Sequence, residues 1–133
     1  MNILTEDKAE KLLVKYIPVA RSVMTKTPIQ AIAATTKLKF PVVLKLISPK
    51  AIHKTEVNGV RIVNNHDELR HEYSDLYKTA QRKKLPFEGV LVQEFVKGHE
   101  LIIGLKNDPT FGPIVALGFG GKYVEVIKDV TFR

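Results

Sequence analysis

One lysine and one histidine stand where chemistry on a phosphate group is possible. Lys45 follows the apolar run Pro41–Leu44, and His53 follows it in a basic loop that also carries Lys50 and Lys54. A charged side chain is rarely buried without a partner, so a Lys45 that points inward needs an anion to meet. These residues indicate a phosphate-handling site. The alternative is a strand lysine that points to solvent and a histidine on a polar loop surface.

The elements around these residues read as strand, loop and strand. Valine and leucine in the run before Lys45 suit a β-strand, and a second apolar run, Val60–Val63, suits another. Pro49 fixes φ at one end of the loop, and Gly59 permits a positive φ at the other end. The stretch 42–60 therefore predicts two strands that hold a basic loop between them.

A second candidate site lies at residues 93–100, QEFVKGHE. Phe95 and Val96 offer an apolar surface to a planar base, and the end of a strand exposes backbone C=O and N–H groups that suit adenine. Glu100 is placed to accept hydrogen bonds from two ribose hydroxyls. The alternative interpretation is a plain hairpin with Glu100 at its surface.

Composition narrows the functional class. The chain has 133 residues, no cysteine and a formal net charge of +7. It predicts one domain, or one domain with a small lobe, and excludes a disulfide framework. The sequence has no apolar run near the roughly 18 residues of a membrane span and no signal peptide, so we expect a cytoplasmic protein without a membrane partner. The lysines are scattered and no zinc-finger or RNP spacing occurs, so anionic nucleotides or coenzymes explain the charge and nucleic acid is not expected.

The first part of the chain alternates helices and strands. Thr5 and Thr27 are candidate N-caps of helices, the first over 6–16 and the second beginning at Pro28. A short strand is expected over 19–24, and a third helix starts near Asn65. The expected buried positions are Ala9, Leu12, Leu13 and Tyr16 in the first helix and Ile29, Ile32, Ala33 and Leu38 in the second.

The last part of the chain reads as an antiparallel meander. Its strands are expected over 89–96, 100–105, 112–117 and 123–127. The sequence thus predicts an α+β chain with a small helix–strand lobe over 1–87 and an incomplete antiparallel sheet lobe over 88–133.

Two long segments carry a family resemblance. FPVVLKLISPKAIHKTEVNGVRI and GVLVQEFVKGHELIIGLKNDPTFGPIVALGFGGKYVEVIKDVTFR closely resemble the ATP-grasp domain of ADP-forming acyl-CoA synthetases, relatives of the succinyl-CoA synthetase β subunit. The resemblance runs from about Leu4 to Arg133. It implies an ATP-grasp fold and a ligase that binds ATP or ADP and converts acyl-CoA, ADP and phosphate into acid, CoA and ATP.

The resemblance also implies roles for single residues. Lys45 matches the lysine that contacts the ATP phosphates, Glu94 and Val96 match the hinge that holds adenine through its backbone, and Glu100 matches the ribose-binding acid. His53 matches a histidine proposed to carry a phosphoryl group to and from a partner α subunit, which holds the CoA and acid sites. Lys50 and Lys54 belong to the matching phosphate loop and would offset charge on the transferred group.

Two departures limit what the resemblance implies. The family has a lysine where this sequence has Glu10. The family domain also continues past the DVTFR motif, in a part that carries its Mg²⁺ ligands, so no metal site is expected in this chain. We therefore expect the chain to be inactive alone and to need the missing C-terminal half of the domain. The alternative is a non-catalytic nucleotide-binding or partner-docking module.

Overall fold

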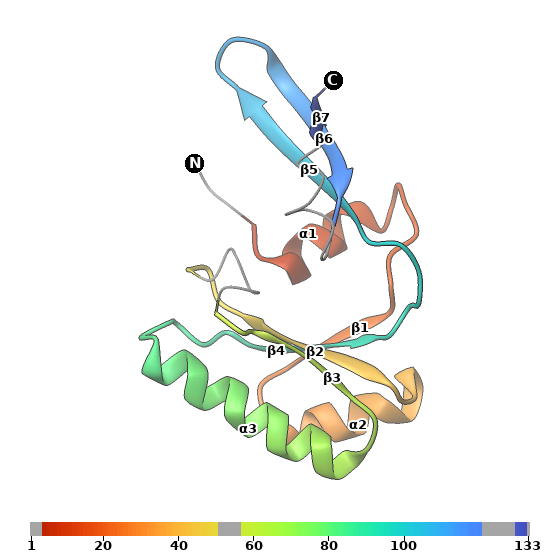
Figure 1. Ribbon diagram of the computed structural model, residues 1–133, viewed down its shortest axis with the longest axis vertical. Coiled ribbons are helices and arrows are strands. Elements are labelled where there is room, and N and C mark those ends of the chain that lie inside the picture. Colours follow the sequence, from red (N-terminus) through yellow and green to blue (C-terminus); the bar gives the residue numbers. More distant parts are fainter. Residues whose placement is uncertain (1–3, 51–56, 121–129, 133) are drawn as a thin grey trace. The chain divides into compact units, whose positions relative to one another are not determined.

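The computed structural model describes residues 4–50, 57–120 and 130–132 (Figure 1). The chain divides into two compact units, Met1–Val96 and Lys97–Arg133. Each unit contains its own antiparallel sheet. The α+β class predicted from the sequence is confirmed.

The first unit is built on a four-stranded sheet in the order β1-β4-β2-β3, in which every neighbouring pair is antiparallel. β2 lies at its centre, and Lys45 in β2 is opposite Leu91 on one side and Val60 on the other. The strands are β1 (Ser22–Thr25), β2 (Val42–Ile47), β3 (Val60–Val63) and β4 (Gly89–Glu94).

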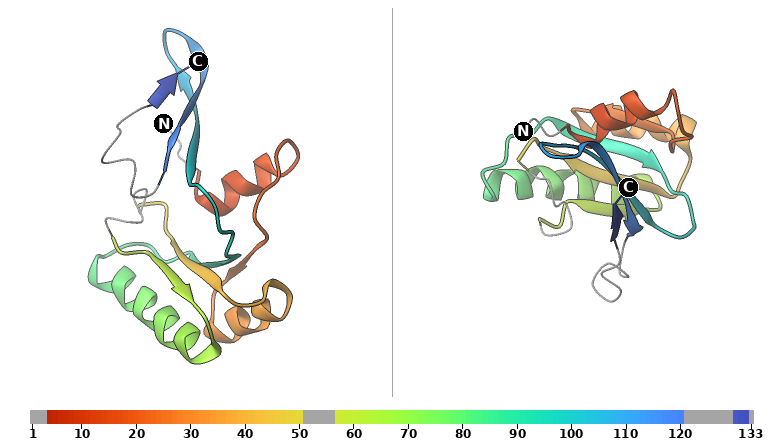
Figure 2. Two further views of the ribbon diagram at one scale, coloured as in Figure 1. Left: turned by 45° about the vertical axis from the view of Figure 1, so that its right-hand side comes forward. Right: turned by 90° about the horizontal axis from the view of Figure 1, so that it is seen from above.

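Two helices, α2 (Pro28–Leu38) and α3 (His66–Arg82), cover one face of this sheet (Figures 1 and 2). Alternate residues of β2 point into the core beneath them, and Leu44 is fully buried there. Because side chains alternate across a strand, Lys45 points to the opposite face. The core consists of Ala31, Ala34, Leu38, Val42, Leu44, Leu46, Val63, Leu69, Tyr73, Leu76, Ala80, Val90 and Val92.

Helix α1 (Glu6–Leu13) lies on that opposite face (Figures 1 and 2). It ends three residues before the predicted end, and two members of its expected buried stripe, Leu12 and Tyr16, are exposed. The buried residue of the helix is Asp7. The other two members of the stripe, Ala9 and Leu13, are partly buried, and the helix also contacts the sheet through polar side chains, described below.

Local capping chemistry sets the starts of α2 and α3 as the sequence predicted. The Thr27 side chain accepts a hydrogen bond from the Gln30 amide, and Asn65 accepts one from the Glu68 amide at 2.8 Å. The expected buried face of α2 was partly wrong, because Ile29 is 79% exposed while Ala31, Ala34 and Thr35 are buried beside Leu38.

The second unit is a three-stranded antiparallel sheet in the order β5-β6-β7. Its strands are β5 (Leu101–Asp108), β6 (Gly112–Phe119) and β7 (Val130–Phe132). The Asp108 carboxylate closes the β5–β6 turn by accepting hydrogen bonds from the Thr110 and Phe111 amides, and these bonds hold its pKa below the usual value. The strand expected over 123–127 lies outside the described residues.

The boundary between the units differs from the one expected. The sequence predicts that the second lobe begins at residue 88, whereas β4 pairs with both β1 and β2 inside the first sheet. The first compact unit consequently extends to Val96. Strand β4 follows α3 in sequence, and only its long-range pairing reveals which sheet it joins.

Candidate functional site

Lys45 meets a carboxylate on the face of the sheet that carries α1. Its Nζ atom donates a hydrogen bond to Glu6 Oε1 at 2.5 Å. The two side chains are 22% and 30% exposed, so the pair is partly shielded from solvent. The prediction that an inward-pointing Lys45 needs an anion is consistent with this contact, and the anion comes from the first turn of α1.

Glu10 fixes the same helix to the sheet one turn further on. Its carboxylate accepts hydrogen bonds from Ser22 Oγ at 2.9 Å and from Gln93 Nε2 at 2.6 Å. Ser22 and Gln93 are opposite each other in β1 and β4. Glu10, at the position where the resemblance implied a lysine, therefore hydrogen-bonds to two neighbouring strands.

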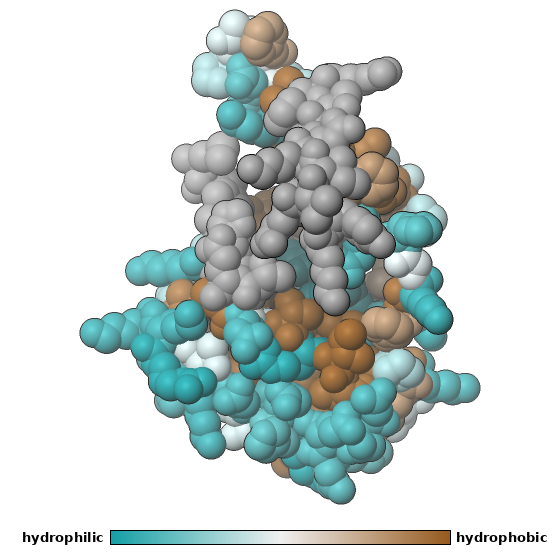
Figure 3. All heavy atoms as spheres, in the orientation of Figure 1, coloured by the Kyte–Doolittle hydropathy of each residue, from teal (hydrophilic) through white to brown (hydrophobic). Residues whose placement is uncertain are grey.

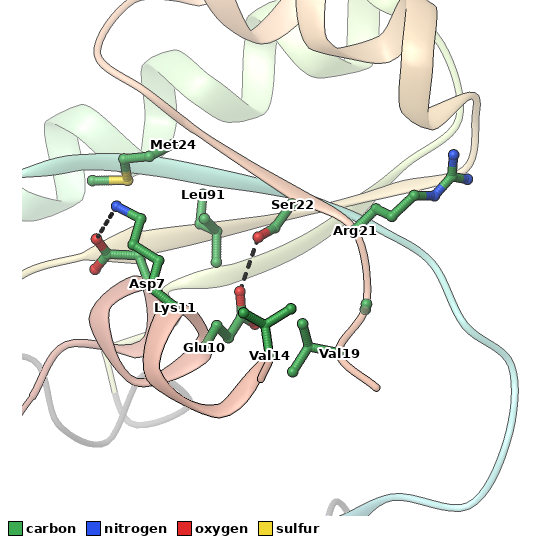
Figure 4. A pocket seen from close by; sticks show the side chains of 10 residues that line it. Asp7, Glu10, Lys11, Val14, Val19, Arg21, Ser22, Met24 and Leu91 are labelled. Carbon is green, nitrogen blue, oxygen red and sulfur yellow. Dashed lines mark hydrogen bonds and ion pairs between the residues drawn. The ribbon is translucent and has the colours of Figure 1, made fainter. Parts of the chain in front are cut away.

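A cavity of about 350 Å³ lies beside these contacts, between α1 and the strands β1 and β4 (Figure 4). Lys45 does not line it, although Glu10 and Arg21 do. Asp7 borders the cavity with one buried oxygen, Oδ1, for which the described residues supply no hydrogen-bond partner, and its Oδ2 lies 3.8 Å from Lys11 Nζ. The lining residues are Asp7, Glu10, Lys11, Val14, Val19, Ala20, Arg21, Ser22, Met24 and Leu91.

Glu94, at the end of β4, is held by Arg21. The Arg21 backbone amide donates to Oε1 at 2.8 Å and the guanidinium Nε donates to Oε2 at 2.7 Å. The backbone hydrogen bond first, and the guanidinium second, hold the pKa of Glu94 below its usual value. Phe95 and Val96 follow with exposed side chains. The strand end is thus fixed through a side chain, while its next two residues face solvent.

The other predicted site residues are distributed over both units. Lys50 is exposed, with its backbone amide 3.4 Å from Ser48 Oγ, and Glu100 is exposed in the second unit. His53 and Lys54 lie outside the described residues. The structure brings Lys45 together with Glu6, a partner that the sequence did not identify.

Sequence reasoning missed Glu6 and Arg21 as members of the site. Acidic residues in the first turn of a helix are already explained by the helix dipole, so the start of α1 did not by itself point to Lys45. A signal was nevertheless present, because a helix rich in carboxylates before a strand that contains a lysine can supply that lysine with a counter-ion. Among the described residues, no group of three or more histidine or acidic side chains is placed to hold a metal ion, and no helix is long and apolar enough to cross a membrane.

The model of the ATP-grasp domain family matches residues 1–133, and the chain belongs to this family. It is 43% identical to 4-hydroxybutyrate–CoA ligase (ADP-forming) of Nitrosopumilus maritimus over 99% of this chain and 20% of that protein. It is 36% identical to the β subunit of acetate–CoA ligase (ADP-forming) I of Pyrococcus furiosus, over 98% of this chain and 58% of the subunit. The resemblance to ADP-forming acyl-CoA synthetases is confirmed.

Solved structures agree with the sequence comparison. The fold matches acetyl-coenzyme A synthetase 1 of Ca. Korarchaeum cryptofilum in complex with coenzyme A, Ca-AMPCP and HgCl⁺, with a TM-score of 0.86 and 41% identity. The match covers 98% of this chain and 59% of that one. PH1788 from Pyrococcus horikoshii matches with a TM-score of 0.83 and 34% identity, over 98% of this chain and 57% of that one. The chain therefore spans between a fifth and about three fifths of these relatives.

Proposed function

We propose that this chain is the ATP-binding part of an ADP-forming acyl-CoA synthetase. The whole enzyme would convert acyl-CoA, ADP and phosphate into the acid, CoA and ATP. The observation that carries the proposal is Lys45, a partly buried cation on the sheet face opposite α2 and α3, in a chain of the ATP-grasp domain family. The solved structure of a relative of 41% identity is a complex with coenzyme A, Ca-AMPCP and HgCl⁺, which supports nucleotide binding.

In this proposal the nucleotide is held by three parts of the chain. Lys45 binds the phosphates with its ammonium group, which is a strong hydrogen-bond donor to anions. The backbone groups of Glu94 and Val96 bind adenine, and the Arg21 contacts to the Glu94 carboxylate fix that strand end. Glu100 accepts hydrogen bonds from the ribose hydroxyls.

His53 is proposed as the phosphoryl carrier. A neutral imidazole is nucleophilic near pH 7, and one of its nitrogens attacks the γ-phosphorus of ATP while ADP leaves; the reverse step regenerates ATP. Lys50 and Lys54 lie close in sequence and offset the charge of the phosphoryl group. A Ca. Korarchaeum cryptofilum relative, 40% identical to this chain, was solved with a phosphorylated phosphohistidine segment, which supports a phosphohistidine step in such an enzyme, while the assignment to His53 rests on the family resemblance.

The proposed activity needs partners. The described residues contain no group of three or more acidic or histidine side chains placed to hold Mg²⁺. We propose that a further part of the ATP-grasp domain supplies such a group and that an α subunit supplies the CoA and acid sites. One face of the second unit supports the proposal of a further part of the domain, which would cover the apolar side chains of that face. Six of these side chains are 44–64% exposed: Leu101, Ile103, Leu105, Val115, Leu117 and Phe119.

The nucleotide role is tested by Lys45→Ala. The variant removes the proposed phosphate donor, so the dissociation constant for ADP, measured by chemical-shift titration, is expected to rise at least about tenfold, in line with the loss of a charged hydrogen bond. Lys78→Ala is the matched control, because Lys78 is exposed on α3, which covers the other face of the sheet. Equal affinity of wild type and Lys45→Ala would refute the role of Lys45.

A reconstitution experiment distinguishes between two functions of this chain, a catalytic part of the enzyme and a non-catalytic docking module. The chain alone is expected to show no synthesis of ATP from acetyl-CoA, ADP and phosphate. Together with the remaining domain half and an α subunit, it is expected to become labelled by γ-³²P-ATP, and His53→Ala is expected to abolish both labelling and turnover while ADP still binds. Undiminished labelling of His53→Ala would assign the carrier role to another group.

A further inference from the structure

We propose that Glu6 is an internal counter-ion of Lys45 with which a nucleotide phosphate must compete, so that Glu6 sets the affinity of the site for phosphate-bearing ligands. The proposal rests on the phosphate-binding role of Lys45 and adds a residue from α1 to the site. The ligand class is a nucleoside di- or triphosphate. In the ligand-free protein the Glu6 carboxylate pairs with the Lys45 ammonium group, and a bound phosphate takes the place of that carboxylate.

The contact itself is the first support. Glu6 Oε1 lies 2.5 Å from Lys45 Nζ, and both side chains are partly buried. A partly buried ammonium would be costly without a counter-ion, and Glu6 removes that cost in the ligand-free protein. A phosphate that approaches the same nitrogen meets the Glu6 carboxylate and is repelled by it.

The way in which α1 is attached is the second support. Polar contacts link α1 to the sheet face, among them Glu6 to Lys45 and Glu10 to Ser22 and Gln93. Apolar side chains of this segment, Leu12 and Val14, are more than half exposed. A carboxylate held by ionic contact can exchange its partner for water, whereas an apolar anchor would lose buried area on release.

Charge decides the competition. A carboxylate carries one negative charge, while the terminal phosphate of ADP carries more and offers several acceptor oxygens. At sufficient concentration the phosphate therefore displaces Glu6 from Lys45. The apparent affinity of the protein for the phosphate is lowered by the free energy of the Glu6–Lys45 pair. A pair of this exposure contributes up to about fivefold in an equilibrium constant.

The test compares Glu6→Gln with wild type in the 133-residue chain, by amide chemical-shift titration with ADP and with adenosine. Glu6→Gln keeps the size of the side chain and removes its charge, so ADP is expected to bind about fivefold more tightly. Adenosine, which has no phosphate, is expected to bind both proteins equally. Asp67→Asn is the matched control, because it makes the same charge change at a carboxylate that is 96% exposed on α3.

The double variant with Lys45→Ala separates competition from general repulsion. In that background the effect of Glu6→Gln is expected to fall below about twofold, since the Lys45 ammonium group for which the phosphate competes has been removed. A persistent fivefold effect, or an equal gain in Asp67→Asn, would overturn the proposal. So would equal or weaker ADP binding by Glu6→Gln.

The outcomes also distinguish this inference from the proposed function. If wild type does not bind ADP, or if Lys45→Ala binds it as well as wild type, the proposed function fails and the inference fails with it. If Lys45→Ala weakens binding and Glu6→Gln does not strengthen it, the inference alone fails. Glu6→Asp, which keeps an acid at the helix start but shortens its reach by one methylene, gives a second variant should Glu6→Gln not fold; it too is expected to bind ADP more tightly, and an unchanged affinity would count against the proposal.

Discussion

Gly89, the first residue of β4, is a position where one methyl group should cost much of the stability of the first unit. Its φ angle is +144°, which residues other than glycine rarely adopt. A Cβ atom at this position would lie 2.4 Å from the backbone oxygen of Thr25 and 2.9 Å from Met24 Cε. Met24 can move, but the Thr25 oxygen belongs to the neighbouring strand β1.

The cost of Gly89→Ala follows from that neighbour. The Thr25 oxygen accepts a hydrogen bond from the Tyr73 hydroxyl, and Thr25 Oγ1 donates one to the Val90 oxygen at 2.7 Å. To reach an ordinary contact distance of 3.4 Å, β1 would have to move by about 1 Å against both bonds. Backbone strain of about 1 kcal/mol and overpacking of about 2 kcal/mol predict a total loss of about 3 kcal/mol.

The assay is urea unfolding followed through resolved amide resonances, so that each unit is observed separately. A loss of about 3 kcal/mol should lower the midpoint of the β4 resonances by about 2 M. Gly112→Ala is the control, because Gly112 also has a positive φ, +73°, but a Cβ atom there meets nothing within 4 Å. Its β6 resonances should report the strain alone, about 1 kcal/mol. An equal loss in both variants would refute the steric argument.

Three further predictions concern single contacts. Asn65→Ala should destabilise the first unit by about 1 kcal/mol in the same assay, whereas Thr5→Ala should have little effect, because the Asn65 side chain caps its helix and the Thr5 side chain does not. Arg21→Ala should raise the carboxyl pKa of Glu94 only part of the way towards its usual value of 4.5, as measured by NMR titration, because the variant removes the guanidinium contacts but keeps the backbone amide, which is the larger cause of the lowered pKa. Burial raises the pKa of Tyr73, so the folded chain keeps this proton while the unfolded chain loses it; stability should therefore fall as the pH rises above about 10, and less so in Tyr73→Phe.

Local chemistry predicted most of the first unit. The Thr27-Pro28 pair and Asn65 predicted two helix starts because capping depends on residues that are close in sequence. The position of β4 was not predictable in this way. Its sequence suits a strand in either sheet, and the choice depends on pairing with β1 and β2, the former more than sixty residues away along the chain.

The buried face of α2 likewise could not be predicted from local sequence alone. Ile29 lies on a helix with a clear apolar pattern, yet it is 79% exposed because small residues, Ala31 and Ala34, face the sheet. A periodic pattern identifies a stripe of apolar residues, but several stripes can be drawn on a short helix rich in alanine and isoleucine. The contact with the sheet selects one of them.

One part of the candidate site could be predicted from local sequence, and another part depends on the fold. Lys45 could be identified from its own strand, because a cation within an apolar run requires an anion if it is buried. Which anion it meets depends on the fold, since Glu6 is 39 residues earlier in the sequence and on a different element. The local sequence does not distinguish a lysine that only its ligand neutralises from a lysine that already has a counter-ion in the folded chain. They differ in ligand affinity, because the second must give up one charge before it binds another. Under the proposed phosphate-binding role of Lys45, its occupancy by phosphate would depend on how strongly Glu6 holds the same ammonium group.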